Sequence, residues 1–486
     1  MWSTKIYQRL ERTNQWISKP APPDIFLTIF SQPHGNSPRG LRHLGLMKAH
    51  LLSLGLAAFA LTANASETLI LKLEPDQRVV LAGENREVVL KVDLTAAKSK
   101  PSARRLPLNL AIVIDRSGSM GGAKMEKARQ AASGLIDQLT SKDIVSVVAY
   151  HDRAETIWPA SPVTEREDIK RRIEAIRPGG STALYAGVET GAEQLARNFG
   201  SDRINRVILL SDGLANIGPS STADLKDLGR RLAGRGYSVS TIGVGDDYNE
   251  DLMAGIAAAS DANYYYVKDA EKLPEIFAKE LGELVSITAR SVRIEIICPD
   301  GVEPIELIGR EEKFRGRKAV VELAPFASGQ NRYVFLRCRV KSDKPVPSAD
   351  LATVRLSYRD ELNESKENAV DRAVQIAFTD KPKEAAASVN TAVAAEREII
   401  VNALVKDQAI ADADGGRAAA GAKKLKDNAA RLLAAAPAAP PAERQKLEET
   451  AKSQIQQADD METKGMSRGL RKEMQSDSYK TRNAKQ

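Results

Sequence analysis

The sequence predicts an α/β protein: a doubly wound, mostly parallel sheet, accompanied by an antiparallel β-sandwich and a C-terminal helical region. The first observation is that apolar, strand-like runs alternate with amphipathic segments over residues 106–287. The second is that strand-like runs follow one another without helices over residues 288–383, and the third is an Ala-rich stretch over residues 384–486. With 486 residues, the chain is long enough for two or three folded units.

The front of the chain has the order of a secretory signal over residues 47–65. A basic residue follows Met47, an apolar run covers residues 51–61, and small residues end the segment, so cleavage is expected after Ala65. The apolar run is shorter than the roughly 20 residues that a membrane span requires. Residues 1–46 show no clear period, and we expect them to be a non-native upstream extension. The mature protein is therefore expected to be exported, to the periplasm or the cell exterior, without an integral membrane span.

The charge of the chain gives no support for nucleic-acid binding. The formal net charge is +7, but residues 1–65 hold seven Lys/Arg against two Asp/Glu. The remainder therefore carries only +2 and has no basic block broad enough to follow a phosphate backbone. We expect no nucleic-acid partner.

Few histidines and cysteines remain once the predicted signal is removed. Three of the four histidines precede residue 66, which leaves His151, and the two cysteines are Cys298 and Cys338. This set cannot build a His-rich or Cys-rich zinc site. The two cysteines form either one disulfide, as an exported protein permits, or two buried thiols. Their residue types and positions leave both alternatives open.

The α/β unit is predicted element by element from its periodicity. Strands are expected at residues 108–115, 143–150, 206–212, 239–245 and 264–267. Helices are expected at residues 124–139, 166–176, 184–199, 223–236, 250–260 and 273–285. The strands are almost continuously apolar, which is typical of parallel strands with both faces covered by helices.

The segments on either side of this unit complete the predicted architecture. After residue 287, strands are expected at residues 289–298, 318–326, 331–340, 352–360 and 373–380. The strand-like runs within residues 66–105 have no sheet of their own, so we infer that they join this sandwich and that the α/β unit is inserted into it. Three helices are expected at residues 393–413, 419–436 and 442–462, followed by a flexible tail of low apolar content.

Polar side chains follow three elements of the predicted parallel sheet. Asp115, Ser117 and Ser119 come directly after the first strand, Thr182 precedes a helix, and Asp212 ends the strand at residues 206–212. The carboxyl ends of parallel strands meet at one edge of a sheet, where ligands bind. Because residues two apart in an extended turn face alike, the first three side chains point the same way. The sequence therefore predicts one site made from five oxygen-bearing side chains.

Two carboxylates and three hydroxyls are hard oxygen donors, which suit Mg²⁺, with Mn²⁺ or Ca²⁺ as alternatives. Few of these ligands are charged, so a bound cation keeps positive charge that a carboxylate from another molecule can neutralise. The pattern predicts a metal-dependent protein-binding module, used in adhesion or assembly, whose metal completes its coordination with an acidic residue of the partner.

The three motifs together resemble a von Willebrand factor type A domain with a metal-ion-dependent adhesion site. The residues that match the motifs of that family, in order, are Asp115, Ser117, Ser119, Thr182 and Asp212. The resemblance covers residues 108–287 and implies a Rossmann-like fold, a bound metal and a protein partner, without identifying the partner. The later strands and the C-terminal segment resemble bacterial exported proteins described as similar to calcium-activated chloride channels. The mature chain has no membrane-length apolar run and is not expected to form a channel.

Other functions are less well supported by the residues. An aspartyl-phosphate phosphatase places a second acid two residues after its nucleophile, but Ser117 stands there, so we expect no enzyme. The alternative that stays open is a structural or assembly protein of the cell envelope in which the metal only stabilises the fold. The oligomeric state is unknown from the sequence. Arg116 lies at a variable position of the first motif, and nothing in the sequence explains an arginine there.

Overall fold

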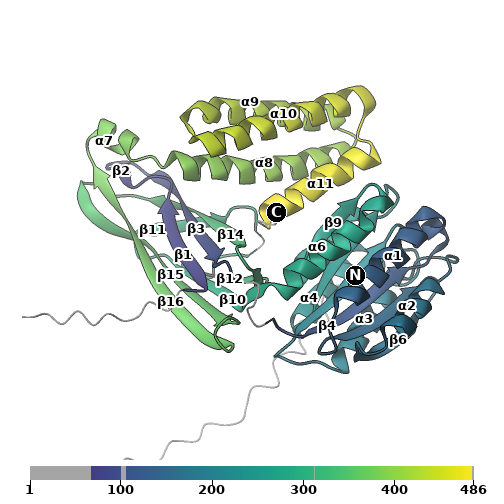
Figure 1. Ribbon diagram of the computed structural model, residues 1–486. Helices are drawn as coiled ribbons and strands as arrows, with labels where there is room; N and C mark the ends of the chain where they lie inside the picture. Colours follow the sequence, from purple (N-terminus) through teal and green to yellow (C-terminus); the bar gives the residue numbers. More distant parts are fainter. Residues whose placement is uncertain (1–66, 100–104, 311, 484–486) are drawn as a thin grey trace, which may run out of the picture. The chain divides into compact units, whose positions relative to one another are not determined.

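The computed structural model describes residues 67–99, 105–310 and 312–483. The expected upstream extension and signal segment, residues 1–65, lie outside the described residues. Within the described ranges, the chain forms a mostly parallel sheet with helices on both faces, two further sheets packed face to face, and a group of C-terminal helices (Figure 1). The predicted fold class is confirmed.

The parallel sheet has the strand order β6-β5-β4-β7-β8-β9. Its strands are β4 (Leu108–Asp115), β5 (Ile144–Tyr150), β6 (Ala154–Pro162), β7 (Ile204–Ser211), β8 (Ser238–Val244) and β9 (Tyr264–Val267). Only β6 is antiparallel to its neighbour in this sheet. The sequence analysis did not predict β6, which contains Pro159, and its position at an edge accommodates a residue that cannot donate to a ladder.

The helices of this unit cover both faces of the sheet. They are α1 (Ala123–Gln138), α2 (Arg166–Glu174), α3 (Leu184–Ala196), α4 (Thr222–Ala233), α5 (Glu250–Ala259) and α6 (Leu273–Val285), with short 3₁₀ turns η1 (Gly118–Met120) and η2 (Ala270–Lys272). Helices α1, α2 and α6 share a core with one face, and α3, α4 and α5 share a core with the other. All eight residues of β4 are buried, as expected for a central strand.

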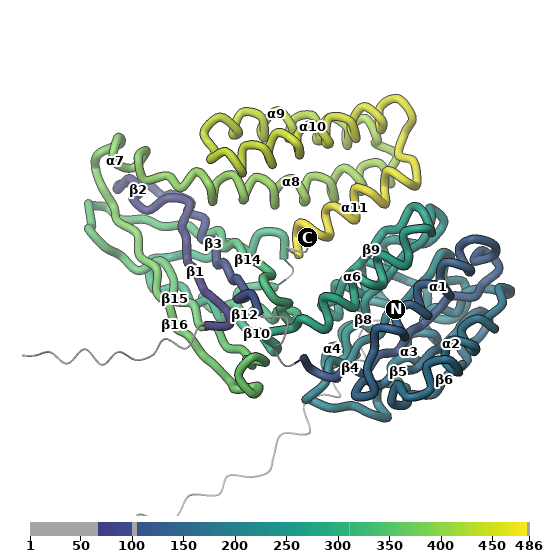
Figure 2. Tube along the Cα trace, viewed as in Figure 1, coloured from purple at the N-terminus to yellow at the C-terminus, as the bar shows by residue number. Residues whose placement is uncertain are grey.

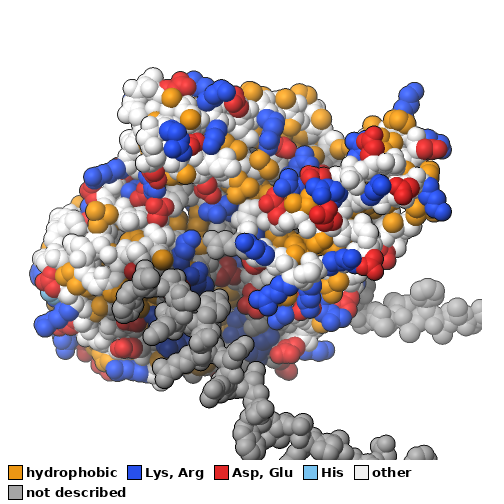
Figure 3. Space-filling view, turned by 180° about the vertical axis from the view of Figure 1, so that it is seen from behind, with side chains coloured by type: hydrophobic (Ala, Val, Ile, Leu, Met, Phe, Trp, Pro, Cys, Tyr) orange, Lys and Arg blue, Asp and Glu red, His pale blue; other side chains and the backbone are white. Residues whose placement is uncertain are grey.

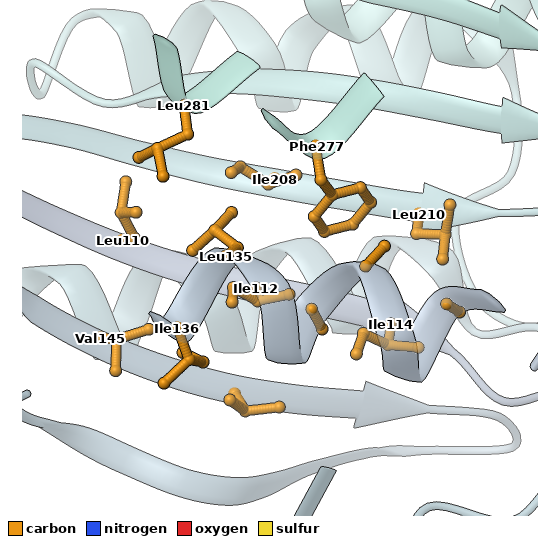
Figure 4. Packing of buried hydrophobic residues seen from close by; sticks show 14 of the residues in the cluster. Leu110, Ile112, Ile114, Leu135, Ile136, Val145, Ile208, Leu210, Phe277 and Leu281 are labelled. Carbon is orange, nitrogen blue, oxygen red and sulfur yellow. The ribbon is translucent and has the colours of Figure 1, made fainter. Parts of the chain in front are cut away.

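The side chains of β4 alternate between these two cores because residues two apart in a strand face alike. Leu110, Ile112 and Ile114 pack against α1 and α6, as Figure 4 shows. Ala111 and Val113 pack on the opposite face. The strand that carries Asp115 is therefore held rigidly from both sides, which fixes the position of that carboxylate.

The sandwich consists of two sheets, ordered β1-β3-β14-β11 and β12-β10-β15-β16-β2, with β13 also paired to β10. Its strands are β1 (Leu69–Pro75), β2 (Val79–Leu81), β3 (Arg86–Ala96), β10 (Ile287–Ile297), β11 (Val302–Leu307), β12 (Lys318–Leu323), β13 (Phe326–Ala327), β14 (Asn331–Val340), β15 (Val346–Asp360) and β16 (Lys366–Thr379). Figure 2 shows the purple strands β1 and β3 beside the teal-green β14, although more than 200 residues separate them in sequence. By chain order, the α/β unit is inserted between β3 and β10.

The two cysteines lie in this sandwich as free, buried thiols. The Cys338 thiol is 3.4 Å from the carbonyl oxygen of Val88, to which it donates. Burial raises the pKa of the Cys298 thiol to about 11 and raises that of Cys338 further. Both therefore stay in the unreactive thiol form near neutral pH.

The C-terminal helices are α7 (Pro382–Ala387), α8 (Thr391–Asp414), α9 (Ala418–Ala435), α10 (Pro441–Lys464) and α11 (Arg468–Arg482), with a 3₁₀ turn η3 (Ala436–Ala438). Small apolar clusters hold α8, α9 and α10 together. On the face shown in Figure 3, Lys and Arg side chains stand among Asp and Glu side chains. Lys426 of α9, for example, pairs with Asp459 and Glu462 of α10 at 2.9 and 2.8 Å.

The structure differs from the expected flexible tail, because residues Arg468–Arg482 form helix α11. Tyr479 of this helix is 2% exposed and joins the apolar core beside β9 of the α/β unit. Its hydroxyl donates to the carbonyl oxygen of Ala262 at 2.6 Å. Lys472 forms a buried ion pair with Glu250 at 2.7 Å and lies over the Tyr248 ring. The charged residues that suggested a solvated tail are thus the groups that dock the helix.

Within the ranges described above, no helix is long and apolar enough to cross a lipid bilayer.

Candidate metal centre

The five predicted side chains come from three loops at the carboxyl edge of the parallel sheet. Asp115 ends β4, and Ser117 and Ser119 follow it. Thr182 lies just before α3, and Asp212 directly follows β7. Strands β4 and β7 are neighbours, and β4 lies where the chain turns from building one half of the sheet to building the other. This is the edge position at which open α/β sheets bind ligands.

The structure brings these side chains together. The hydroxyl oxygens of Ser117 and Ser119 are 3.1 Å apart, and Ser119 Oγ donates to Asp212 Oδ1 at 2.7 Å. A Cβ atom built on Gly213 would lie 3.1 Å from Thr182 Oγ1, 3.3 Å from Ser119 Oγ and 3.7 Å from Ser117 Oγ. The three hydroxyls therefore border one small space, which the missing side chain of Gly213 leaves free.

Asp115 lies at the base of this group and is completely buried. Its Oδ1 accepts a hydrogen bond from the Ser117 amide at 2.8 Å, and its Oδ2 accepts from Ser211 Oγ at 2.7 Å and from the Tyr150 hydroxyl at 3.4 Å. These hydrogen bonds fix the orientation of the carboxylate at the base of the group. Burial raises the pKa of Asp115, against the hydrogen bonds from Ser117 and Ser211, and the Asp212 carboxylate raises it further.

Backbone contacts lock the loop before Thr182 to the loop after β4. The Gly179 amide donates to the Arg116 carbonyl oxygen at 2.7 Å, and the Gly118 amide donates to the Gly180 carbonyl oxygen at 3.0 Å. Gly180 has φ +81°, and a Cβ there would lie 2.6 Å from His151 Nδ1, so only glycine fits. The "PGGST" segment thus serves to bring Thr182 to Ser117 and Ser119.

Lys124, in the first turn of α1, belongs to the site and was missed by the sequence analysis. Its Nζ is 2.5 Å from Asp212 Oδ2, and the Asp212 side chain is fully buried while that of Lys124 is 27% exposed. A lysine at a helix N-terminus is unfavourable for the helix dipole. That mismatch is the signal that could have pointed to a partner carboxylate, although it does not say which one.

His151, which the sequence leaves as the one histidine after residue 65, and the tyrosines of β9 lie outside this space. His151 Nδ1 is 3.1 Å from Asp152 Oδ2, and the pair is partly exposed. Tyr264 and Tyr265 are buried in the sheet, where Tyr264 contacts the Tyr479 ring at 5.5 Å between centroids. These positions agree with packing roles for both tyrosines.

Chemically, the site offers three neutral hydroxyls, two carboxylates and one ammonium group. Nowhere in the described part of the chain do three or more His, Cys, Asp or Glu side chains gather into a metal-binding cluster. The donor set is therefore unsuited to a soft or imidazole-seeking metal, and its oxygen atoms fit a hard divalent cation. With Lys124 counted, the site carries a net charge of −1 before a cation binds.

Comparison with known proteins defines the class of the α/β unit. Residues 109–279 match the family model of the von Willebrand factor type A domain. A solved von Willebrand factor type A structure from Catenulispora acidiphila has a TM-score of 0.65 at 16% identity, covering 85% of this chain and 96% of that one. The α/β unit is thus a von Willebrand factor type A domain, a class that typically mediates protein–protein interaction.

Two curated relatives show how far the likeness extends. The chain is 30% identical over 277 residues to the uncharacterised protein sll0103 of Synechocystis, covering 54% of this chain and 64% of that protein. It is 28% identical over 226 residues to the magnesium-chelatase 67 kDa subunit of Heliobacterium mobile, covering 43% of this chain and 32% of that subunit. The chain therefore spans less than two thirds of the length of either relative.

Proposed function

We propose that the von Willebrand factor type A domain of this chain is a metal-dependent protein-binding module. In this proposal Mg²⁺ is held by Asp115, Ser117, Ser119, Thr182 and Asp212, and an acidic side chain of another protein completes the coordination. The observation that carries the proposal is the convergence of three hydroxyls beside Gly213, next to two buried carboxylates. Mn²⁺ and Ca²⁺ take the same kind of oxygen donors and are the alternatives.

The charge balance supports an acidic partner group. A divalent cation placed in a site of net charge −1 leaves a net charge of +1, so a carboxylate that approaches from solvent is attracted. The hydroxyl of Ser119 belongs to an exposed residue, whereas Asp115 and Asp212 are buried. Ser117 and Thr182 are also buried, so a partner would reach the metal from the side of Ser119.

Binding is favoured over catalysis by the contacts of the two serines. Ser119 Oγ donates to Asp212 Oδ1, but Asp212 Oδ2 pairs with Lys124, and in this proposal the carboxylate would also hold the cation, so it is not free to act as a general base. His151 is hydrogen-bonded to Asp152 and not to either serine. We therefore propose that the chain is not an enzyme.

The test is a pull-down from cell-envelope extract, with the full-length chain as bait, in Mg²⁺ and in EDTA. The paired variant Ser119→Ala/Thr182→Val removes two metal ligands without touching the buried Asp115, and Ser181→Ala is the matched loss of a hydroxyl next to Thr182. The proposal expects a partner that is released by EDTA and by the paired variant but retained by Ser181→Ala. A partner that survives EDTA, while Mg²⁺ still raises the melting temperature, would instead support a structural role for the metal.

We also propose that the protein is exported through the signal at residues 47–65 and acts in the periplasm or outside the cell. The support is the order of basic, apolar and small residues in that segment. N-terminal sequencing of the protein isolated from its natural cells should give a chain that begins at Ser66, and an intact N-terminal segment would overturn this proposal. The likeness of the strands after residue 287 and of the C-terminal segment to exported proteins of the calcium-activated chloride channel type stays a prediction.

A further inference from the structure

A hollow of about 310 Å³ lies beside the loop that carries the proposed metal ligands. Its charged lining residues are Arg116, Glu155, Arg172 and Arg177, and Ile157 contributes apolar surface. These residues come from the loop after β4, from β6, and from α2 and the segment that follows it. The hollow is therefore built within the von Willebrand factor type A domain itself.

The hollow and the metal loop are parts of one connected structure. Arg116 directly follows Asp115, and its carbonyl oxygen accepts from the Gly179 amide at 2.7 Å. Its Nη1 lies 3.5 Å from the Arg177 carbonyl oxygen. Arg116 lines the hollow and lies between Asp115 and Ser117 in sequence, so the hollow borders the loop that carries these two proposed ligands.

The charges around the hollow are unbalanced. Three guanidinium groups face one carboxylate, that of Glu155, which is 3.5 Å from Arg116 and 53% exposed. Arg177 donates to the backbone carbonyl oxygens of Glu174 and Ile176, which leaves its charge uncompensated. Among the described residues no ion pair involves Arg172, and Arg116 Nε is buried without a hydrogen-bond partner. The lining has a net charge of +2.

We propose that this hollow receives additional acidic side chains of the protein that binds the metal site, so the partner presents an acidic segment and not a single isolated carboxylate. This inference rests on the proposed function, because one acidic residue of the segment ligates the metal. Guanidinium groups pair with carboxylates through two parallel hydrogen bonds, and the half-buried Ile157 offers apolar surface to the methylenes of a glutamate. Arg116 is not one of the proposed metal ligands, and in this proposal it contributes to the specificity for the partner.

The test measures fluorescence anisotropy of two labelled peptides with the full-length chain. One is a short oligoglutamate, and the other is a Gly/Ser peptide of equal length with one glutamate. The double variant Arg116→Gln/Arg172→Gln removes two charges from the hollow. Arg171→Gln is the matched control, because Arg171 is the neighbour of Arg172 on α2 but is 76% exposed and paired with Asp168.

We expect the double variant to weaken oligoglutamate binding about tenfold at low salt and the control to change it by less than about twofold, since exposed ion pairs contribute little. The single-glutamate peptide should be unaffected by the double variant. Unchanged oligoglutamate binding in a folded double variant would overturn the inference. The same comparison in EDTA separates the two proposals. If Mg²⁺ changes the affinity of neither peptide, the proposed function fails. The difference in oligoglutamate affinity between the native chain and the double variant in EDTA then still decides the inference.

Discussion

Lys124 offers the sharpest prediction about the metal centre, because its ammonium group competes with any cation that approaches Asp212. The proposed perturbation is Lys124→Met, which keeps the length of the side chain and removes its charge. Without Lys124 the site changes from a net charge of −1 to −2. Mg²⁺ should therefore bind more tightly to the variant than to the native chain.

The magnitude follows from the position of the ammonium group. Lys124 Nζ is 2.5 Å from Asp212 Oδ2, and a Mg²⁺ bound at Asp212, directly or through water, lies about 2–4 Å from that carboxylate. At a separation of about 5 Å, a doubly charged ion and an ammonium group repel by roughly 2 kcal/mol in water and about 7 kcal/mol at an effective dielectric constant of about 20. Because the Lys124 side chain is 27% exposed and that of Asp212 is fully buried, the value in water is a lower bound on the repulsion. It corresponds to about a thirtyfold decrease in Kd.

The same substitution should lower the stability of the metal-free chain. Asp212 is fully buried, and removing the partner of a buried charge costs about 3 kcal/mol or somewhat less where the partner is partly exposed. Isothermal titration calorimetry with MgCl₂ measures the affinity, and thermal unfolding in EDTA and in Mg²⁺ measures the stability. The variant should melt earlier in EDTA and show a larger rise in Tm on addition of Mg²⁺.

Lys127→Met is the matched control for this experiment. Lys127 lies three residues further along α1 and pairs with Glu271 at 2.7 Å, so its loss changes the net charge equally without touching Asp212. Equal Mg²⁺ affinities for the Lys124 variant and the native chain would refute the electrostatic reasoning. An equal gain in both variants would show that the effect comes from the overall charge and not from this contact.

Three further predictions concern the site and its support. Gly213→Ala places a methyl group 3.1 Å from Thr182 Oγ1. Calorimetry should show at least about a tenfold loss of Mg²⁺ affinity, and the free energy of unfolding should change by no more than about 1–3 kcal/mol. Unchanged Mg²⁺ affinity would contradict the assigned position of the site. Burial raises the pKa of Asp143, but its hydrogen bonds and ion pair outweigh burial and hold the pKa below 3.8, so its stabilisation is present above about pH 4 and lost as the pH falls through that lowered pKa. Chemical unfolding across this pH range should show that Asp143→Asn does not lose this part of the stability as the pH falls. If the native chain and the variant lose stability in parallel, the lowered pKa of Asp143 would be contradicted. Tyr479→Ala should lower the free energy of unfolding by about 3–5 kcal/mol. Tyr479→Phe keeps the ring but loses the hydrogen bond to Ala262, and should lower it by about 1 kcal/mol. Equal denaturation midpoints for the two variants would show that the ring is not packed as described.

The fold, and the convergence of five polar side chains at one edge of the sheet, could be predicted because their signals are local. An almost continuous apolar run such as residues 108–114 identifies a central strand, and polar residues directly after such strands must lie at the ligand-binding edge. Periodicity also placed the helices of the α/β unit, since their apolar faces pack on the sheet.

The features that the sequence did not reveal depend on distant partners or on weak local patterns. Lys124 pairs with a carboxylate 88 residues away, and its position in the first turn of a helix does not identify that carboxylate. Strand β6 has Pro159 in its middle, which argues against a strand unless the edge position is known. Helix α11 has few apolar residues because buried ion pairs and Tyr479 do much of the docking, so a hydropathy pattern underestimates it.

The central claim is that the side chains beside Gly213 hold a divalent cation. The most direct test is anomalous diffraction from crystals soaked in Mn²⁺, collected in parallel for the native chain and for Ser119→Ala/Thr182→Val. The account predicts an anomalous peak bordered by the hydroxyls of Ser117, Ser119 and Thr182 in the native crystals, and no such peak in the variant. A fully soaked native crystal without a peak there, or with equal peaks in both, would contradict it.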